Sequence, residues 1–230
     1  PRRVFLVGAN PFVLLPGRLE EIAGLIRRYL PTVESIGCFA RVTDVGLKSE
    51  EDLRRLRALG YDGLTVGVET GDEEALAFMN KGYRAQDIVE QAARLDGAGI
   101  SYSFFYLAGI SGADRGTEGA LRSAEVFNRT RPVRVGSSML TVFPNSELYR
   151  EIQAGNWKEE SELEKLEELK VLIEHLDIPT RFETDGASNL VHVRGELPRD
   201  RTALAGYLDR LIAGADEEAL RAYRVNLKHL

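Results

Sequence analysis

The chain has 230 residues, of which 43% are hydrophobic and 29% are charged, and its formal net charge is −6. Its apolar runs fall short of the about 18 consecutive residues that cross a membrane, and its acidic balance differs from the basic stripe typical of a nucleic-acid surface. A single cysteine excludes a disulfide framework and fits a reducing compartment, so we expect a cytoplasmic protein.

Short apolar runs alternate with helical patterns along the first 150 residues. Strands are predicted at residues 4–7, 35–39, 64–69, 102–107 and 135–140. Helices are predicted near residues 19–29, after an N-cap at Ser49, and at residues 73–79, 86–97 and 117–129. This alternation is typical of βα units that build a parallel sheet, so we expect an α/β fold.

The sequence pattern changes after residue 150. Charged residues dominate residues 158–176, where leucines at helical spacing predict a solvated helix with one buried stripe. The rest is predicted as a loop at 179–189, a short strand at 190–193, and short helices at about 200–213 and 216–226. We therefore divide the chain into residues 1–150 and a mostly helical C-terminal extension, residues 151–230, with a short strand.

The most informative stretch is residues 53–83. Gly60 is predicted to end a helix in the left-handed conformation, and residues 64–68 form a strand covered on both faces. Glu69 follows directly, and an acid at the carboxyl end of a parallel strand lies where α/β folds place ligand contacts. Glu69 is therefore the first candidate for a site residue.

Five short motifs occur in the order found in one enzyme family. Residues 40–41 (AR) are similar to the end of its third strand, and residues 66–71 (VGVETG) to its "G-hydrophobic-E-S-G" strand. Residues 79–83 (MNKGY) are similar to its "hydrophobic-N-K/R-G" turn. Residues 98–112 (AGISYSFFYLAGISG) and 142–148 (VFPNSEL) are similar to "A-G-I … G-hydrophobic-x-G" and "x-P-G-T-x-L". On these motifs the chain resembles the radical S-adenosylmethionine (SAM) superfamily over most of residues 1–155.

The resemblance implies both a fold and an activity. The fold is a partial (βα)6 TIM-like open barrel, and the activity is that of an oxidoreductase or transferase with a [4Fe–4S] cluster and SAM as cofactors. One electron cleaves SAM to methionine and a 5′-deoxyadenosyl radical, which abstracts hydrogen from an unidentified small molecule, tRNA or protein. The implied partner is an electron donor. The branch with oxygen-independent coproporphyrinogen oxidases and tRNA methylthiotransferases is favoured.

The cysteine content departs from the family pattern. Family members hold the cluster with three cysteines, C-x-x-x-C-x-x-C, whereas this chain has only Cys38, which we interpret as a small core residue. The three histidines lack metal-ligand spacing, so no metal ligand is predicted within the chain. We expect the first strand and the cluster loop to be missing from this sequence, the cluster ligands to lie outside it, and the chain to be inactive alone.

Three charged residues are candidates for contacts with SAM. Glu69 is expected to accept hydrogen bonds from the amino group or the ribose hydroxyls, the alternative being a cap or ion pair for the neighbouring loop. Lys81 is expected to pair with the SAM carboxylate, the alternative being a surface lysine. Arg41 is expected to hold that carboxylate by two parallel bonds, and its alternative is an internal ion pair with Asp44 or Glu69.

Three uncharged residues complete the predicted SAM site. Asn10 lies where the family often carries an acidic or amide residue facing the pocket, and a turn formed with Pro11 explains it equally well. Ser103 is expected to line the interior, since alternate residues of a strand face opposite sides and Phe104 then points away. Gly109 is expected to allow backbone approach to the adenine, the alternative being an ordinary glycine turn.

Two other functions remain open on the sequence alone. A metal-free TIM-barrel enzyme would use Glu69 and Lys81 as acid and base, and would be active without iron or SAM. A non-enzymatic SAM-binding or scaffold protein would have lost its cluster, and would have no cysteine triad before residue 1.

Overall fold

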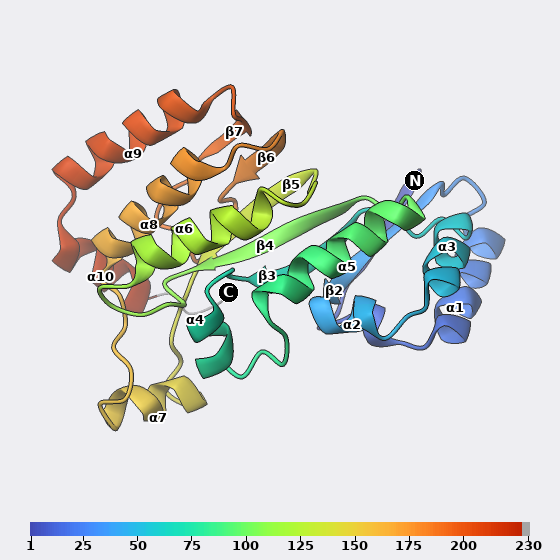
Figure 1. Cartoon of the computed structure of the whole chain (residues 1–230), viewed down its shortest axis with the longest axis horizontal. Coiled ribbons are helices and arrows are strands. Elements are labelled where there is room, and N and C mark those ends of the chain that lie inside the picture. Colours follow the sequence, from blue (N-terminus) through green and yellow to red (C-terminus); the bar gives the residue numbers. More distant parts are fainter. Residues whose placement is uncertain (227–230) are drawn as a thin grey trace.

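Strands and helices alternate through the whole chain, as Figure 1 shows. The computed structural model describes residues 1–226. The strands are β1 (Arg3–Leu6), β2 (Ser35–Arg41), β3 (Leu64–Glu69), β4 (Tyr102–Ala108), β5 (Arg134–Met139), β6 (Thr180–Glu183) and β7 (Arg194–Leu197). The helices are η1 (Pro11–Val13), α1 (Pro16–Tyr29), α2 (Val42–Gly46), α3 (Glu50–Ala58), α4 (Glu73–Phe78), α5 (Ala85–Ala98), α6 (Gly116–Phe127), α7 (Glu147–Gln153), α8 (Glu162–His175), α9 (Arg201–Gly214) and α10 (Glu217–Val225).

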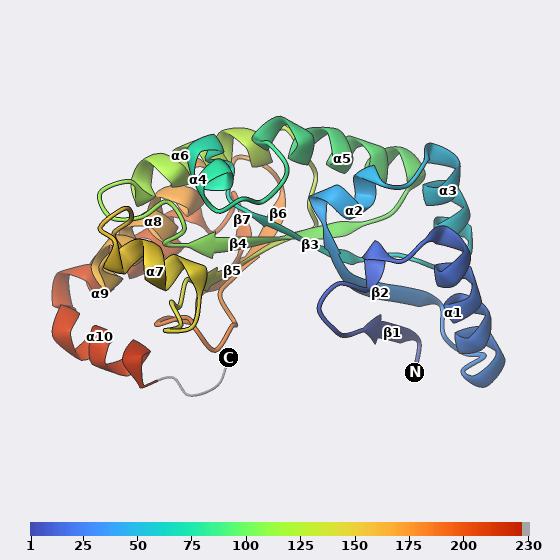
Figure 2. The ribbon, with the colours of Figure 1, turned by 90° about the horizontal axis from the view of Figure 1, so that it is seen from below.

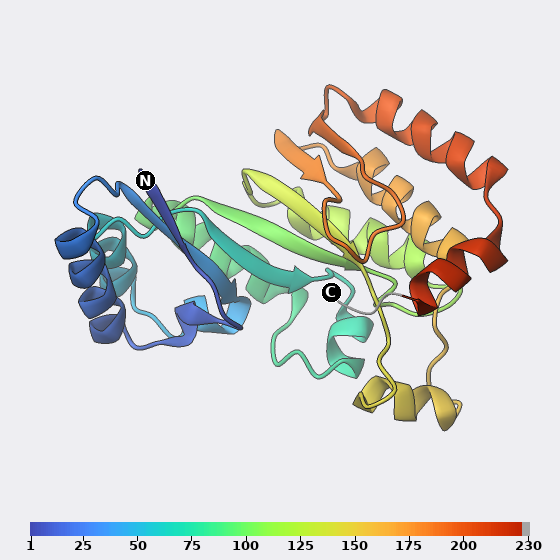
Figure 3. The same ribbon diagram turned by 180° about the vertical axis from the view of Figure 1, so that it is seen from behind.

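One sheet contains all seven strands, in the order in which they occur along the chain. The pairs from β1 to β6 are parallel, and β7 is antiparallel to β6. Each parallel connection crosses over one face of the sheet, so the connecting helices gather there (Figure 2). Figure 3 looks onto the opposite, open face of the curved sheet. The predicted open, TIM-like α/β architecture is confirmed.

Aromatic packing sets which residues of β4 point to the helices. The ring of Phe104 lies 5.2 Å from that of Phe127 on α6, and the ring of Tyr106 lies 6.2 Å from it. Successive side chains of a strand point to opposite faces, so Ser103 and Phe105 point to the open face. The helix face of the sheet is therefore core, and the open face carries the side chains that remain available to a ligand.

The C-terminal part of the chain differs from the sequence prediction in its strands. β6 lies inside the predicted loop 179–189, so that loop prediction was wrong, and the strand predicted at 190–193 forms instead at β7. β6 forms by pairing with β5, and the four residues of β6 carry no sequence pattern that would predict this long-range pairing. β6 and β7 continue the sheet that residues 1–150 begin. The division of the chain into two domains at residue 150 stays a prediction.

Helix α8 has the predicted buried leucine stripe, but several of its charged residues are buried as well, so the predicted solvation of its charged side is only partly right. It lies between α6 and α9, so Glu162, Lys165 and Glu168 are fully buried. The buried charges are paired: Lys165 Nζ lies 3.3 Å from a Glu162 oxygen, and Nε of Arg224 on α10 donates to the same carboxylate at 2.6 Å. These ion pairs tie the C-terminal helices to the sheet.

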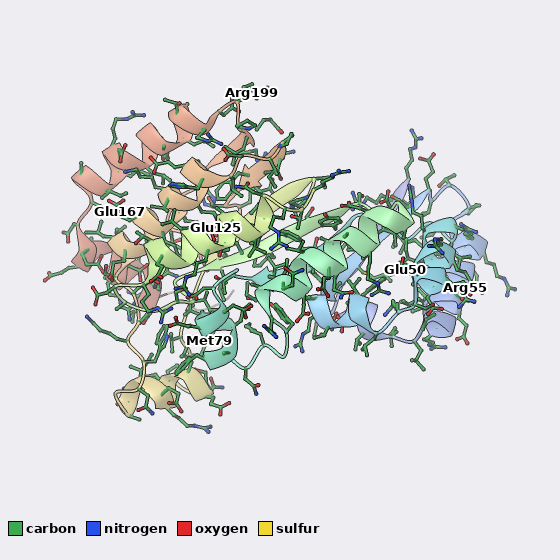
Figure 4. All side chains as sticks on the ribbon, in the orientation of Figure 1. Glu50, Arg55, Met79, Glu125, Glu167 and Arg199 are labelled. Atoms are coloured by element: carbon green, nitrogen blue, oxygen red, sulfur yellow. The ribbon has the colours of Figure 1, made fainter. Side chains whose placement is uncertain are left out.

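The outer surface of the helix layer is charged and solvated. Arg55 on α3 and Glu125 on α6, both labelled in Figure 4, are exposed. Among residues 1–226 no helix combines the length and the apolar character that crossing a bilayer requires.

Candidate functional site

The last residue of β3 adopts an unusual backbone conformation. Glu69 has φ of +59°, in the left-handed region that non-glycine residues rarely occupy, and the register with β4 shifts between Gly67 and Glu69. A Cβ placed on Gly67 would lie 3.0 Å from a Glu69 carboxylate oxygen, so that side chain folds back over Gly67. A left-handed conformation costs about 1–2 kcal/mol, and such strain concentrates at functional sites.

A buried serine on α6 holds the turn after Glu69. The hydroxyl of Ser123 accepts a hydrogen bond from the Gly71 amide at 2.7 Å and lies 3.0 Å from the hydroxyl of Thr70. The same hydroxyl donates to the Gly119 carbonyl at 2.7 Å. The turn is therefore anchored to the helix layer, while Glu69 itself projects toward the open face.

Lys81 and Tyr83 approach Glu69 from the turn between α4 and α5. Lys81 Nζ lies 3.6 Å from Glu69 Oε2, and the two side chains are 28% and 23% exposed, so a ligand can reach both. The Tyr83 hydroxyl donates to the Val68 carbonyl at 3.0 Å. Burial, and secondly the Glu69 carboxylate, raises the pKa of Tyr83, which keeps this hydroxyl protonated as a donor.

Arg41 reaches the same region from the end of β2. It is opposite Gly67 in the parallel register, so it shares the open face with Glu69. Its backbone amide donates to Asp44 Oδ2 at 2.6 Å, and within residues 1–226 its exposed guanidinium forms no ion pair. The alternative of an internal ion pair is therefore not realised in the described part of the chain. Lys81 thus pairs with Glu69, and Arg41 lies on the neighbouring strand of the same face.

Ser103 lies on β4, and Asn10 lies in the loop after β1. Ser103 is nearly buried on the open face, but it lies near the amino end of β4, opposite Thr65, whereas Glu69 is opposite Tyr106. The structure therefore does not bring Ser103 together with Glu69 at the carboxyl edge. Asn10 follows β1 and precedes η1, and its side-chain oxygen is buried without a hydrogen-bond partner in the described part of the chain. A buried acceptor without a donor is uncommon in folded proteins, and a ligand that supplies a donor satisfies it.

Gly109 lies in a different environment from the other candidates. Its φ is +92°, and its amide donates to Glu168 Oε2 at 2.6 Å. A Cβ at this position would lie 2.9 Å from Cε of Lys165. The positive φ and the approach of α8 therefore favour glycine here, and the Gly109 amide is already bound to α8.

A pair of buried carboxyl groups near Gly109 has no signal in the sequence. Glu160 is 1% exposed and Glu168 is completely buried. Burial raises the pKa of Glu160 to about 10, with the neighbouring Glu168 as the next cause, and burial raises the pKa of Glu168 to about 7. The pair is therefore expected to retain a proton at neutral pH. Tyr83 and Ser123 were also missed, since their positions depend on the bend after β3.

Cys38 does not offer a cluster ligand. It is completely buried, and burial raises its pKa to about 12, whereas cluster ligation requires a thiolate. Within the described residues no group of three or more His, Cys, Asp and Glu side chains could hold a metal ion.

A cavity of about 510 Å³ opens beside the end of β5. Its walls combine apolar side chains with charged ones: Val142, Phe143, Tyr149, Ile152, Glu159 and Arg221. This volume is within the range of about 300–1,000 Å³ typical of small-molecule sites.

The comparisons with known families give one match. The family model described as the Radical SAM superfamily matches residues 1–122, which is more than half of the 230 residues. No curated protein matches the chain.

Several solved structures share the fold. An N-terminally deleted Elp3 from the archaeon Methanocaldococcus infernus has a TM-score of 0.64 and 17% identity, over 90% of this chain and 54% of that one. Coproporphyrinogen III oxidase from Escherichia coli, a radical SAM enzyme, has a TM-score of 0.59 and 13% identity, over 98% and 67%. The radical SAM methyltransferase TsrM from Kitasatospora setae has a TM-score of 0.54 and 20% identity, over 67% and 31%. The chain thus spans about half the length of the Elp3 form.

Proposed function

The chain belongs to the radical SAM superfamily, and we propose that the carboxyl edge of its sheet binds S-adenosylmethionine. The observation that carries this proposal is the group formed by Arg41, Glu69 and Lys81 on the open face. SAM carries an amino group and a carboxylate on its methionine moiety, and the site offers one carboxylate and two cations to them. Charge-assisted hydrogen bonds of this kind are roughly twice as strong as neutral ones.

Each residue has a separate role in the proposal. Glu69 accepts hydrogen bonds from the amino group or the ribose hydroxyls, Arg41 holds the carboxylate by two parallel bonds, and Lys81 adds a second cation beside it. Asn10 offers its unpartnered amide oxygen to a donor of the ligand, and Ser103 lines the open face. Gly109 has no assigned role in binding, because its amide is already bound to Glu168.

The residues of this chain do not fit a [4Fe–4S] cluster. Cys38 is the only cysteine, and it is buried as a thiol. The proposed reaction therefore needs cluster ligands, and an electron donor, from outside these 230 residues. With SAM bound and a cluster supplied from outside, the chemistry available would be the family's one-electron cleavage of SAM to methionine and a 5′-deoxyadenosyl radical. The contribution of the described residues is to bind and orient SAM and to shield it from water.

Substrate class and reaction type belong to the same proposal. The similarity to oxidoreductases and transferases leaves a small molecule, a tRNA or a protein as the substrate. The cavity beside the end of β5 is the proposed place for a substrate or for part of one.

One alternative function has a specific observation in its favour. The 3.6 Å ion pair of Glu69 and Lys81 brings an acid and a base together, as a metal-free enzyme would require. That alternative predicts turnover without SAM and without iron. A SAM-binding scaffold without a cluster predicts SAM binding and no 5′-deoxyadenosine.

The test is calorimetric titration of the chain with SAM, for the wild type and for Glu69→Gln. Loss of a charge-assisted hydrogen bond costs about 1.5–3 kcal/mol, so the Glu69→Gln affinity is expected to fall about 10- to 100-fold. Glu125→Gln, an exposed carboxylate on the outer surface of α6, is the control and should bind as the wild type does. The proposed site is contradicted if the wild type does not bind SAM, or if Glu69→Gln binds SAM as tightly as the wild type does.

A second measurement separates the functions of the whole protein. The complete gene product is reconstituted with iron and sulfide without oxygen, reduced with dithionite and supplied with SAM. Formation of 5′-deoxyadenosine supports the radical SAM reaction. SAM binding without that product supports the scaffold alternative.

A further inference from the structure

A lysine is buried directly behind the proposed SAM site. Lys48 follows α2 and is 2% exposed. Its Nζ donates to the Phe12 carbonyl at 2.6 Å and to the Asp44 carbonyl at 3.2 Å, and it lies 4.3 Å from the centre of the Phe12 ring. The ammonium group thus contacts two loops that follow neighbouring strands.

Burial of this ammonium is unfavourable unless its surroundings compensate for the lost hydration. Within residues 1–226 no carboxylate lies within ion-pair distance of Lys48, and its partners are carbonyl oxygens and an aromatic face. Taking a charge out of water without a paired countercharge is unfavourable. Burial lowers the pKa of Lys48, and the nearby Asp44 carboxylate acts in the opposite direction. A neutral side chain of the same length would avoid this cost and still fill the space.

The contacts of Lys48 lead to two of the candidate residues. Phe12 belongs to η1, whose N-cap is Asn10. Asp44 belongs to α2, and its carboxylate accepts the backbone amide of Arg41 at 2.6 Å. The ammonium therefore ties the loop that carries Asn10 to the turn that begins at Arg41.

Arg94 on α5 holds the same turn from the outside. Its guanidinium donates to the Val45 carbonyl at 3.0 Å and also to the Lys48 carbonyl. A third bond, from Nε to Glu50, measures 2.7 Å. The segment from Arg41 to Lys48 is thus held by Arg94 on one side and by the Lys48 ammonium on the other. Of these contacts, only the one made by the ammonium connects that segment to the loop of Asn10.

We infer that Lys48 is a positioning residue for the carboxylate end of the bound ligand. It fixes Arg41 relative to Asn10, and its buried charge lies behind the edge where the ligand's carboxylate is proposed to bind. This inference rests on the proposed function. It predicts that Lys48 acts on ligands that carry the amino-acid moiety and not on the nucleoside part.

The experiment compares two probes that share the nucleoside. SAM carries the amino-acid moiety, and 5′-methylthioadenosine lacks it. In Lys48→Met the stem of the side chain remains and the ammonium is lost. We expect SAM to bind about tenfold more weakly and 5′-methylthioadenosine to bind within about twofold of the wild type. Lys48→Arg keeps the charge and the donors, and should restore most of the SAM affinity.

Matched controls separate positioning from stability. Tyr61→Phe removes another buried bond from a side chain to a backbone carbonyl, at 2.8 Å to Leu19 of α1. Tyr61 precedes β3, so this bond lies at the opposite, amino end of that strand. This variant should lower stability without changing either affinity. If Lys48→Met does not fold, Arg94→Met loosens the same turn while leaving the ammonium in place. A loss of SAM affinity of about threefold, with 5′-methylthioadenosine unchanged, is then expected.

The outcomes are distinct. Equal weakening of both probes in Lys48→Met assigns the lysine a purely structural role and overturns the inference, as do unchanged affinities. No binding of SAM by the wild type overturns the proposed function, and the inference with it. Loss confined to SAM, with recovery in Lys48→Arg, supports it.

Discussion

Removal of the Ser123 hydroxyl tests how the turn after β3 is supported. In Ser123→Ala the buried amide of Gly71 loses its 2.7 Å acceptor, and the Gly119 carbonyl loses a donor. A buried donor left without a partner costs about 1–3 kcal/mol, so we expect the free energy of unfolding to fall by about 2 kcal/mol. For a chain of this size that corresponds to a melting temperature lower by about 4–8 °C.

The measurement is urea unfolding followed by circular dichroism, with Ser137→Ala as the control. Ser137 is also buried, and its hydroxyl contacts the Ser138 carbonyl at 3.5 Å, the weak limit of a hydrogen bond. The control therefore deletes the same atom without leaving a strongly bonded amide unpaired. A loss in Ser123→Ala below about 0.5 kcal/mol, or equal to that of Ser137→Ala, refutes the reasoning, because the Gly71 amide must then have found another acceptor.

Two further changes test strain and charge in the same molecule. Glu69→Gly relieves a left-handed conformation that costs about 1–2 kcal/mol and adds a glycine penalty of about 0.5–1 kcal/mol. This variant should therefore unfold at an equal or slightly higher urea concentration than Glu69→Gln, and it should lose SAM binding. A clearly lower urea midpoint would show that Glu69 is not strained. Glu160 and Glu168 have raised pKa values, about 10 and about 7, so the folded protein retains protons that the unfolded chain releases. Their stabilising contribution is complete below a pH of about 4.5 and is lost as the pH rises through those pKa values. The urea midpoint of the wild type should therefore decrease between about pH 5 and 9, and that of Glu160→Gln should decrease less steeply. Identical dependence of the two midpoints on pH would show that the pair does not titrate.

Local signals in the sequence predicted local structure well. Ser49 caps α3 by accepting the Asp52 amide at 3.0 Å, as expected from a serine before three acids. Gly60 is left-handed, with φ of +95°, as expected at the end of a helix. The bounds of β3 are those predicted, because alternating branched and small residues between two turns leave little freedom.

Long-range packing was not visible in the sequence. The charges of α8 suggested a solvated face, but the partner that neutralises Glu162, Arg224, lies 62 residues further along the chain. No periodicity reports such a pairing. The same applies to β6, which is defined by its neighbour β5 and not by its own four residues.

The candidate site was predicted in part. Arg41, Glu69 and Lys81 were chosen from strand ends and a glycine turn, and parallel strand ends meet at one edge of a sheet. Glu69 accordingly pairs with Lys81 and shares a sheet face with Arg41. Their contacts with SAM stay a prediction. The fold of Glu69 back over Gly67, and the role of Lys48 behind it, depend on side-chain directions that a linear sequence does not contain.

The contacts of Arg224 have a practical consequence for shortened versions of the chain. Besides Glu162, this arginine donates to the Ser188 carbonyl at 3.0 Å and to the Thr141 hydroxyl at 3.2 Å, so one side chain near the C-terminus fastens three separate segments. A version that stops at Gly214 would lose it and leave the Glu162 carboxylate to Lys165 alone. Its expected fate is aggregation or proteolysis, and trimming for crystallisation or NMR should therefore keep α10.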